Sequence, residues 1–181
     1  ENQSQTCYLN SLIQTLFHIQ PFRSLIYKSS TDESQKENEL LQSLATLFCQ
    51  MQISSQTAAS TIPFTTAMGW GAGADISTQH DPHELLSVLF DSLNISKEIT
   101  DTFEFTVEDR IVCQVCNNVR SNVQKVLEIM LPVKPGNFKS SLENWQAVET
   151  LELDCEVCKA RNAAKITSNC IKTLPGVLLV S

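Results

Sequence analysis

Four of the seven cysteines form two pairs of identical spacing, and this arrangement is the strongest chemical signal in the sequence. The pairs are Cys113-Gln-Val-Cys116 and Cys155-Glu-Val-Cys158, and 38 residues lie between them. A tight turn after a strand directs both thiolates of such a pair toward one ion, and four thiolates surround zinc at ~2.3 Å. The spacing therefore predicts a tetrahedral zinc site. Four thiolates leave no open position for water, so we expect this site to be structural.

Two other interpretations of these cysteines are open. They could be buried thiols on two unrelated turns, or one pair could be a redox dithiol. A redox pair usually opens a helix in a β–α–β unit, whereas the residues that flank these pairs are strand-like. A small strand-rich lobe often needs a metal because it cannot bury enough apolar surface by itself. The zinc interpretation is therefore favoured.

A second candidate for chemistry is Cys7, which precedes a run of apolar residues at helical spacing. At a helix start, the helix dipole and free backbone N–H groups favour a thiolate and can stabilise an oxyanion. Asn2, five residues upstream, could add a side-chain amide to an oxyanion hole. Alternatively, Cys7 is a small apolar residue at a helix start and Asn2 belongs to a disordered terminus. The residues alone leave both interpretations open.

A nucleophilic cysteine needs a general base, usually a histidine that a carboxylate or an amide orients. The sequence has three histidines, His18, His80 and His83. His18 follows Cys7 by eleven residues on the predicted helix. That separation is roughly 16 Å along the axis at ~1.5 Å per residue, so we expect His18 not to reach the thiol.

The first half of the chain, which must position Cys7, has a helical pattern. Apolar residues at helical spacing predict helices at 7–17, 21–26, 40–51 and 82–93. Thr6 is the expected N-cap of the first helix, and Pro21 begins the second. The glycine-rich segment 68–73 is expected to be a loop.

The second half of the chain has a strand pattern that begins near residue 101. Alternating or continuous apolar runs predict strands at 103–107, 119–123, 126–131, 163–170 and 177–180. One short helix is expected at 142–148, capped by Ser140 or Ser141. Because helices precede strands instead of alternating with them, the predicted fold class is α+β.

The composition limits the class of protein. With 181 residues, the chain suffices for one compact domain or for two subdomains that share a core. The net charge of −7 argues against nucleic acid or an anionic membrane as the main partner. No apolar run is long enough to span a bilayer, and residues 1–5 do not resemble a secretory signal. The odd number of cysteines then favours a reducing compartment, the cytoplasm or the nucleus.

We expect the sequence to be a piece of a longer protein. It has no initiator methionine and opens directly on the segment that contains Cys7. It stops at 177–181, a predicted buried strand that no turn follows.

Four segments resemble motifs of the ubiquitin-specific proteases, which are papain-like deubiquitinases. Asn2-Gln-Ser-Gln-Thr-Cys7-Tyr-Leu-Asn-Ser is similar to the family's Cys box, and Gln79-His-Asp-Pro-His-Glu-Leu85 to its Gln-His-Asp-x-x-Glu-Leu block. The doubled Cys-x-x-Cys resembles the zinc ribbon of the family's fingers, and 171–178 resembles the strand that enters its palm. All four occur in the family's order. Gly69-Trp70 is most similar to the branch that contains the herpesvirus-associated ubiquitin-specific protease.

The resemblance implies a role for each matching residue. Cys7 would be the nucleophile that attacks the carbonyl of ubiquitin's terminal glycine, and Asn2 and the Cys7 backbone N–H would form the oxyanion hole. Gln79, His80 and Asp81 would lie beside the groove that holds the ubiquitin tail. Asp81 would accept hydrogen bonds from the tail, although a carboxylate just before a proline is also a natural helix N-cap. The implied partners are ubiquitin and ubiquitinated proteins, and the implied state is a monomer.

Two departures from the family pattern bear on the site. Ser4 stands where the family usually has glycine, in a loop with unusual backbone angles, so we expect a strained or reshaped oxyanion hole. Pro82 and His83 replace more usual residues of the second motif without removing a catalytic atom. The family's catalytic His box, with its Asp or Asn partner, would follow the position of Ser181. We therefore expect the general base to lie outside this sequence, and not to be His80 or His83.

The architecture implied by the resemblance is a papain-like fold with a helical thumb at 1–100, zinc-ribbon fingers at 101–170 and the first part of the palm at 171–181. The expected function is hydrolysis of the (iso)peptide bond after the C-terminal glycine of ubiquitin, through a thioester on Cys7. Two alternatives are a ubiquitin-binding pseudoenzyme and a zinc-ribbon interaction module with an incidental cysteine. The presence of both Cys7 and Asn2 favours the enzyme, because a scaffold needs neither.

Overall fold

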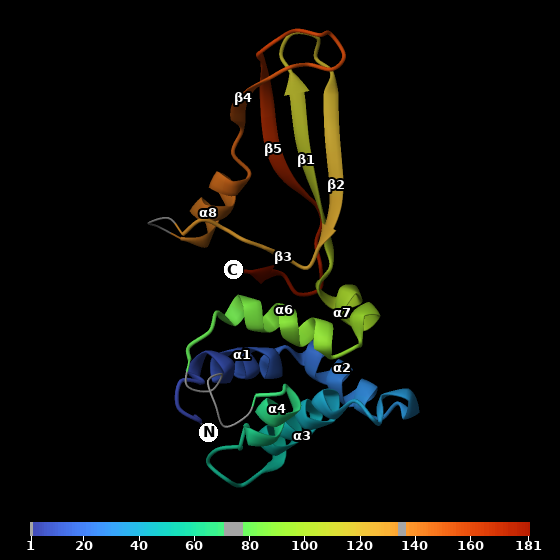
Figure 1. Ribbon diagram of the computed structural model, residues 1–181, viewed down its shortest axis with the longest axis vertical. Coiled ribbons are helices and arrows are strands. Elements are labelled where there is room, and N and C mark those ends of the chain that lie inside the picture. Colours follow the sequence, from blue (N-terminus) through green and yellow to red (C-terminus); the bar gives the residue numbers. More distant parts are fainter. Residues whose placement is uncertain (1, 71–77, 134–136) are drawn as a thin grey trace. The chain divides into compact units, whose positions relative to one another are not determined.

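The computed structural model describes residues 2–70, 78–133 and 137–181 (Figure 1). The chain divides into two units, Glu1–Ile99 and Thr100–Ser181, which are described separately below. The first is helical, and the second consists mainly of strands. Helices thus precede strands along the chain, which confirms the predicted α+β class.

The first unit is built from short helices. Their bounds are Cys7–His18 for α1, Gln20–Ser30 for α2, Glu33–Gln35 for the 3-10 turn η1, Glu39–Ile53 for α3, Ile62–Ala67 for α4 and Pro82–Ser92 for α6. The helix α7, Ser96–Phe103, spans the boundary between the units. The four helices predicted for the first half of the chain correspond to α1, α2, α3 and α6.

The sequence pattern missed two helices. The six residues of α4 are too few for a helical period to be visible. In α7 the apolar residues are Ile99 and Phe103, and Phe103 was predicted as the start of a strand. That prediction was wrong, because Phe103 ends α7 and β1 begins at Phe105.

An aromatic core holds α1 in place. The ring of Phe17 on α1 lies 5.5 Å from that of Phe48 on α3. Phe22 on α2 is fully buried, and its ring lies 6.3 Å from Phe48 and 5.8 Å from Phe90 on α6. This packing fixes one face of α1, whose buried residues are Tyr8, Leu9, Ile13 and Leu16.

The second unit contains a four-stranded antiparallel sheet in the order β2-β1-β5-β4 (Figure 1). Its strands are Phe105–Cys113 for β1, Val119–Val126 for β2, Glu149–Leu153 for β4 and Ala163–Thr173 for β5. The short strands β3, Glu128–Ile129, and β6, Leu179–Val180, pair in parallel. The strand β4 was not predicted, because the alternation of Leu151 and Leu153 with polar residues extends over only five residues. All five residues are exposed.

One predicted helix cap was wrong, and another was right in position only. The helix α8, Phe138–Trp145, begins before Ser140, and the side chain of Asn137 caps it by accepting a hydrogen bond from the Ser140 N–H at 3.0 Å. Thr6 occupies the cap position of α1, but its hydroxyl makes no capping hydrogen bond there. It bonds instead to the residues that precede the helix, as described below.

The core of the second unit lies where β1 meets the short strands and α8. Phe105, Val107 and Ile129 are buried, and partly buried side chains pack against them: Val126, Leu131, Leu142, Trp145, Ile171 and Leu178. Within the described part of the chain, no helix is both long and apolar enough to cross a membrane.

Candidate active site and cysteine cluster

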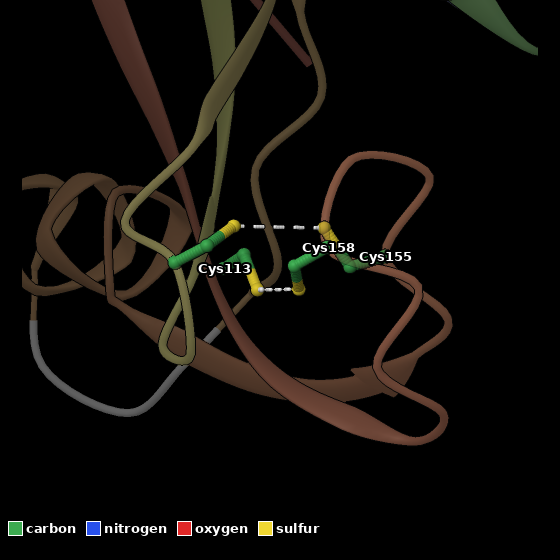
Figure 2. A group of neighbouring side chains, drawn as sticks. Cys113, Cys155 and Cys158 are labelled. Carbon is green, nitrogen blue, oxygen red and sulfur yellow. Dashed lines mark hydrogen bonds between the residues drawn. The ribbon is translucent and has the colours of Figure 1, made fainter.

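The second unit brings the four paired cysteines together. All four Sγ atoms lie within 4.8 Å of one another. Cys113 and Cys158 are separated by 4.0 Å, and Cys116 and Cys155 by 3.8 Å. In Figure 2 the labelled cysteines come from two turns and point toward one another. Four sulfurs around an ion at ~2.3 Å are ~3.8 Å apart, so this cluster could hold a metal ion.

The two turns that carry the cysteines have the same backbone geometry. The Cys113 carbonyl accepts a hydrogen bond from the Asn117 N–H at 2.9 Å, and the Cys155 carbonyl accepts one from the Lys159 N–H at 2.9 Å. Asn117 and Lys159 adopt left-handed φ values of 57° and 59°. Because lysine rarely adopts this conformation, the second turn is held by its surroundings against a local cost.

Negative charge is distributed unevenly over the cluster. Backbone N–H groups of Cys158 and Val157 lower the pKa of Cys155 to about 6. The Asn118 N–H favours the Cys116 thiolate, but desolvation and the neighbouring thiols raise the pKa of Cys116 to about 11. Backbone N–H groups of Cys116 and Val115 also lower the pKa of Cys113. The backbone thus favours thiolates at Cys155 and Cys113, whereas a thiolate at Cys116 needs a neighbouring positive charge such as a bound cation.

In the first unit, Cys7 is the first residue of α1, and its side chain is exposed. The N–H groups of the first helical turn have no acceptor within the helix. This turn contains no acidic residue, so no neighbouring carboxylate on α1 opposes the positive end of the helix dipole. Cys7 therefore lies at a helix start, as predicted.

The loop before Cys7 is held by hydrogen bonds around Asn2. Thr6 is fully buried, and its Oγ1 donates to Asn2 Oδ1 at 2.8 Å. Asn2 Nδ2 donates to the Ser4 carbonyl at 2.9 Å. Ser4 has a φ of 126°, a region that glycine adopts readily and serine does not. The unusual backbone expected at Ser4 is therefore present.

The second motif lies beside the start of α1. The His80 ring is half-buried and lies 5.8 Å from the ring of Tyr8, the residue after Cys7. Trp70 lies 6.3 Å from Tyr8 and 6.2 Å from His80, so three rings from separate segments meet. Residues 71–73 of the predicted loop lie outside the described residues.

The flanking residues of the motif are both exposed. Asp81 is the N-cap of α6, and its side chain accepts a hydrogen bond from the His83 N–H at 2.8 Å. Gln79 lies two residues before Asp81 and is not part of α6. The capping role expected for Asp81 is confirmed, and its exposed position leaves its carboxylate accessible.

His18 is the last residue of α1, at the opposite end of the helix from Cys7. Its Nδ1 lies 2.7 Å from the Gln14 carbonyl. The expectation that His18 cannot serve the thiol therefore agrees with its place in the helix.

Gln3 is a residue of this region that the sequence pattern did not indicate. Its side chain bonds to the hydroxyl of Thr61, which precedes α4, and to that of Thr65, which lies within it. Two threonines four residues apart around Pro63 were the available signal, since a proline often marks the first turn of a helix. Nothing in the sequence paired them with Gln3.

Residues 1–181 match the family described as ubiquitin carboxyl-terminal hydrolase. The chain belongs to this family. It is 32% identical over 178 residues to ubiquitin carboxyl-terminal hydrolase 47 of Drosophila melanogaster, with 88% of this chain and 11% of the relative covered. Its identity to the human protein of the same name is 32% over 184 residues, covering 91% of this chain and 13% of the relative. Ubiquitin carboxyl-terminal hydrolase 5 of Schizosaccharomyces pombe is 32% identical over 162 residues, with coverages of 85% and 14%.

These comparisons support the predicted family and fold. Family membership, the order of helices and sheet, and the four clustered cysteines agree with the papain-like fold of the ubiquitin-specific proteases. The chain spans 11 to 14% of the length of these three ubiquitin carboxyl-terminal hydrolases.

Proposed function

We propose that the protein to which this chain belongs is a deubiquitinating cysteine protease. It hydrolyses the (iso)peptide bond after the C-terminal glycine of ubiquitin and acts on ubiquitinated proteins. The observation that carries this proposal is the exposed Cys7 at the start of α1, in a chain whose whole length matches the ubiquitin carboxyl-terminal hydrolases. Its exposure is what a nucleophile needs and what a packing cysteine does not.

The reaction would proceed in two acyl transfers. The Cys7 thiolate attacks the glycine carbonyl carbon, the C–N bond breaks, and the departing amine takes a proton from the general acid. Water then attacks the thioester, which releases the ubiquitin carboxylate and restores the Cys7 thiol. The histidine that moves these protons would come from the family's His box, C-terminal to the position of Ser181.

The oxyanion of each step would be stabilised by the Asn2 amide and the backbone N–H of Cys7. Helix-start N–H groups and a side-chain amide are donors of the kind that stabilise such charge. The hydrogen bonds that hold Asn2 on both sides support this role, because donors act best when they are oriented before the reaction.

The ubiquitin tail would lie beside Gln79, His80 and Asp81. A shallow hollow next to this motif supports the proposal, and its lining includes Trp70, His80, Glu84, Leu85 and Val88. The carboxylate of Asp81 is exposed and could accept hydrogen bonds from a tail that contains arginine. This role is compatible with its cap, because a carboxylate has two oxygens.

We propose further that the cysteine cluster binds zinc and stabilises the strand-rich unit. Four sulfur ligands would fill all coordination positions of the ion, as in structural zinc sites. In family terms, 1–100 would be the thumb, 101–170 the fingers and 171–181 the beginning of the palm. The assignment to the herpesvirus-associated branch rests on the resemblance of the Gly69-Trp70 pair.

A reducing location, cytoplasmic or nuclear, and a monomeric state complete the proposal. All seven cysteines are free in the structure, which supports a compartment where thiols stay reduced.

The deciding experiment is to treat the full-length protein with ubiquitin that carries an electrophile at its C-terminus. We expect one covalent adduct, located at Cys7 by mass spectrometry of peptides. Cys7→Ala should abolish the adduct. Cys49→Ala is the matched control, because Cys49 is also an exposed cysteine on a helix of the same unit. Cys49 has no role in the proposed reaction, so this variant should still form the adduct.

A wild-type protein that forms no adduct would contradict the proposed activity. If that protein still binds ubiquitin, it is a ubiquitin-binding pseudoenzyme. If it neither reacts with ubiquitin nor binds it, the interaction-module alternative is favoured.

A further inference from the structure

The side chain of Gln3 connects the loop before Cys7 to α4. Its Nε2 donates to Thr61 Oγ1 at 2.8 Å and to Thr65 Oγ1 at 3.1 Å, and its Oε1 lies 3.3 Å from Thr65 Oγ1. Thr61 is 4% and Thr65 is 2% exposed. Hydrogen bonds between groups that are shielded from water hold their partners firmly, because water cannot easily replace them. Gln3 is therefore anchored to a buried part of the helical unit.

The backbone of Gln3 continues this connection to Asn2. The Gln3 N–H donates to Thr6 Oγ1 at 3.0 Å, and Thr6 Oγ1 donates to Asn2 Oδ1 at 2.8 Å. A hydroxyl has a single proton, and the proton of Thr6 is directed to Asn2 because the Gln3 N–H supplies the other hydrogen bond. The position of Gln3 thus determines where the Thr6 hydroxyl points.

The network also fixes which end of the Asn2 amide faces which neighbour. Oδ1 faces the Thr6 hydroxyl, and Nδ2 faces the Ser4 carbonyl, which can only accept. An amide nitrogen carries two N–H groups, so one can hold the orientation while the other donates to an oxyanion. Both ends of the amide group are therefore held, each by a residue that follows Asn2 in the sequence.

We propose that Gln3 is a positioning residue that orients the Asn2 amide through Thr6 by anchoring the loop to Thr61 and Thr65. This inference rests on the proposed function, because it concerns the oxyanion hole of that reaction. Gln3 does not touch the reacting atoms. It acts through Asn2, whose donor must be in place before charge develops on the carbonyl oxygen.

The test compares full-length wild type with Gln3→Met, which keeps the length of the side chain and removes its hydrogen bonds. The substrate is ubiquitin with a fluorogenic amide at its C-terminus. We expect kcat to fall at least about tenfold and at most by the ~10²–10³-fold that loss of an oxyanion donor costs. KM should stay within about twofold, because the tail does not bind through Gln3 in this proposal.

A second readout separates positioning from a general loss of structure. Iodoacetamide alkylates Cys7 by displacement of iodide, a reaction that forms no oxyanion. Its rate at Cys7, followed by mass spectrometry, should therefore remain within about twofold in Gln3→Met. Gln52→Met is the matched control, since Gln52 also bonds to a side chain, Tyr27, in the same unit, and its kcat should equal that of wild type.

A double-mutant comparison tests whether Gln3 acts through Asn2. In an Asn2→Ala background, adding Gln3→Met should lower kcat by less than about twofold, because the positioned group is already absent. Gln3→Glu should recover part of the lost kcat, since its carboxylate can accept hydrogen bonds from both threonine hydroxyls. If Gln3→Met does not fold, Thr65→Val replaces it and should reproduce the same pattern.

The outcomes separate this inference from the function on which it rests. An active wild type with unchanged kcat in Gln3→Met would overturn the positioning role alone. A full additional loss in the Asn2→Ala background, or slowed alkylation of Cys7, would also overturn it and indicate a structural role. A wild type without hydrolysis or adduct would contradict both proposals.

Discussion

The Sγ atoms of Cys116 and Cys155 lie 3.8 Å apart, although 38 residues separate them in the sequence. The sheet topology explains their proximity. β1 and β4 both pair antiparallel with β5, so they run in the same direction and their C-terminal ends reach the same end of the sheet. Each strand is followed by one Cys-x-x-Cys turn. The pairing of the strands therefore assembles the cluster.

Removal of the metal should destabilise the protein. We expect one zinc ion per chain and protection of the four cluster thiols from a thiol reagent. A strong chelator should release the ion and lower Tm by roughly 10 °C or more, since structural zinc supplies folding free energy. Metal analysis by mass spectrometry and a thermal melt measure both effects. A metal content near zero with all four thiols reactive would disprove the zinc assignment.

Cys113→Ser should lower the stability of the strand-rich unit more than it slows the reaction. Cys113 is 2% exposed, and its loss removes one of four ligands, so we expect at least ~3 kcal/mol less unfolding free energy. Cys170→Ser is the control, because Cys170 is an exposed cysteine on β5 outside the cluster. Its stability should change by less than ~0.5 kcal/mol. Equal urea midpoints for the two variants would contradict the prediction.

Ser4→Gly should stabilise the protein. A φ of 126° costs serine ~1–3 kcal/mol, and glycine avoids this cost but loses ~0.5–1 kcal/mol through greater freedom when unfolded. We expect a net gain of ~1 kcal/mol in urea unfolding. Ser4→Ala retains a Cβ and should show no such gain. If Ser4→Gly is no more stable than Ser4→Ala, the backbone conformation at Ser4 does not reduce the stability of the protein.

Two substitutions of Asp81 can separate its role as the cap of α6 from a role in substrate binding. Asp81→Ala removes the side-chain cap of α6 and should cost ~1 kcal/mol of stability. Asp81→Asn keeps an oxygen for the His83 N–H and should preserve stability. If the carboxylate also binds the ubiquitin tail, Asp81→Asn should raise KM for the fluorogenic ubiquitin substrate. Unchanged KM in Asp81→Asn would limit Asp81 to the cap.

The lowered pKa of Glu108 leads us to expect that the stability of the second unit depends on pH. It is 6% exposed, and its Oε2 lies 3.0 Å from Lys172 Nζ and 3.4 Å from Arg110 Nε. The hydrogen bond from Lys172 is the main cause that lowers the pKa of Glu108, Arg110 contributes, and burial opposes them. A lowered carboxyl pKa stabilises the fold above the unfolded-state value of ~4.3, and this stability is lost as pH falls through the folded-state pKa.

Glu108→Gln tests this dependence. The difference in unfolding free energy between wild type and Glu108→Gln should be constant above about pH 6 and should shrink as the pH is lowered below ~4.3. Urea unfolding at several pH values measures it. Glu128→Gln is a control on the short strand β3, outside the sheet that contains β1. A difference between wild type and Glu108→Gln that does not change with pH would exclude titration of Glu108 as its cause.

Where a local pattern was strong, the sequence predicted the fold well. The apolar period found α1, α2, α3 and α6, and it placed Cys7 at a helix start. The apolar period did not reveal α4, α7 and β4, because these elements are short, polar or exposed on both faces. Thr6 was predicted as a cap from its position, but hydrogen bonds to residues before the helix compete for its hydroxyl.

By itself, the sequence determined the chemistry available to this protein. The spacing of the four cysteines, the helix that begins at Cys7, and the carboxylate before Pro82 depend on residues that are close along the chain. Only the tertiary structure decided that Gln3 meets Thr65, 62 positions away, and that Tyr8 meets His80. The reason is physical, because such contacts depend on how separate helices pack, and packing has no period in the sequence.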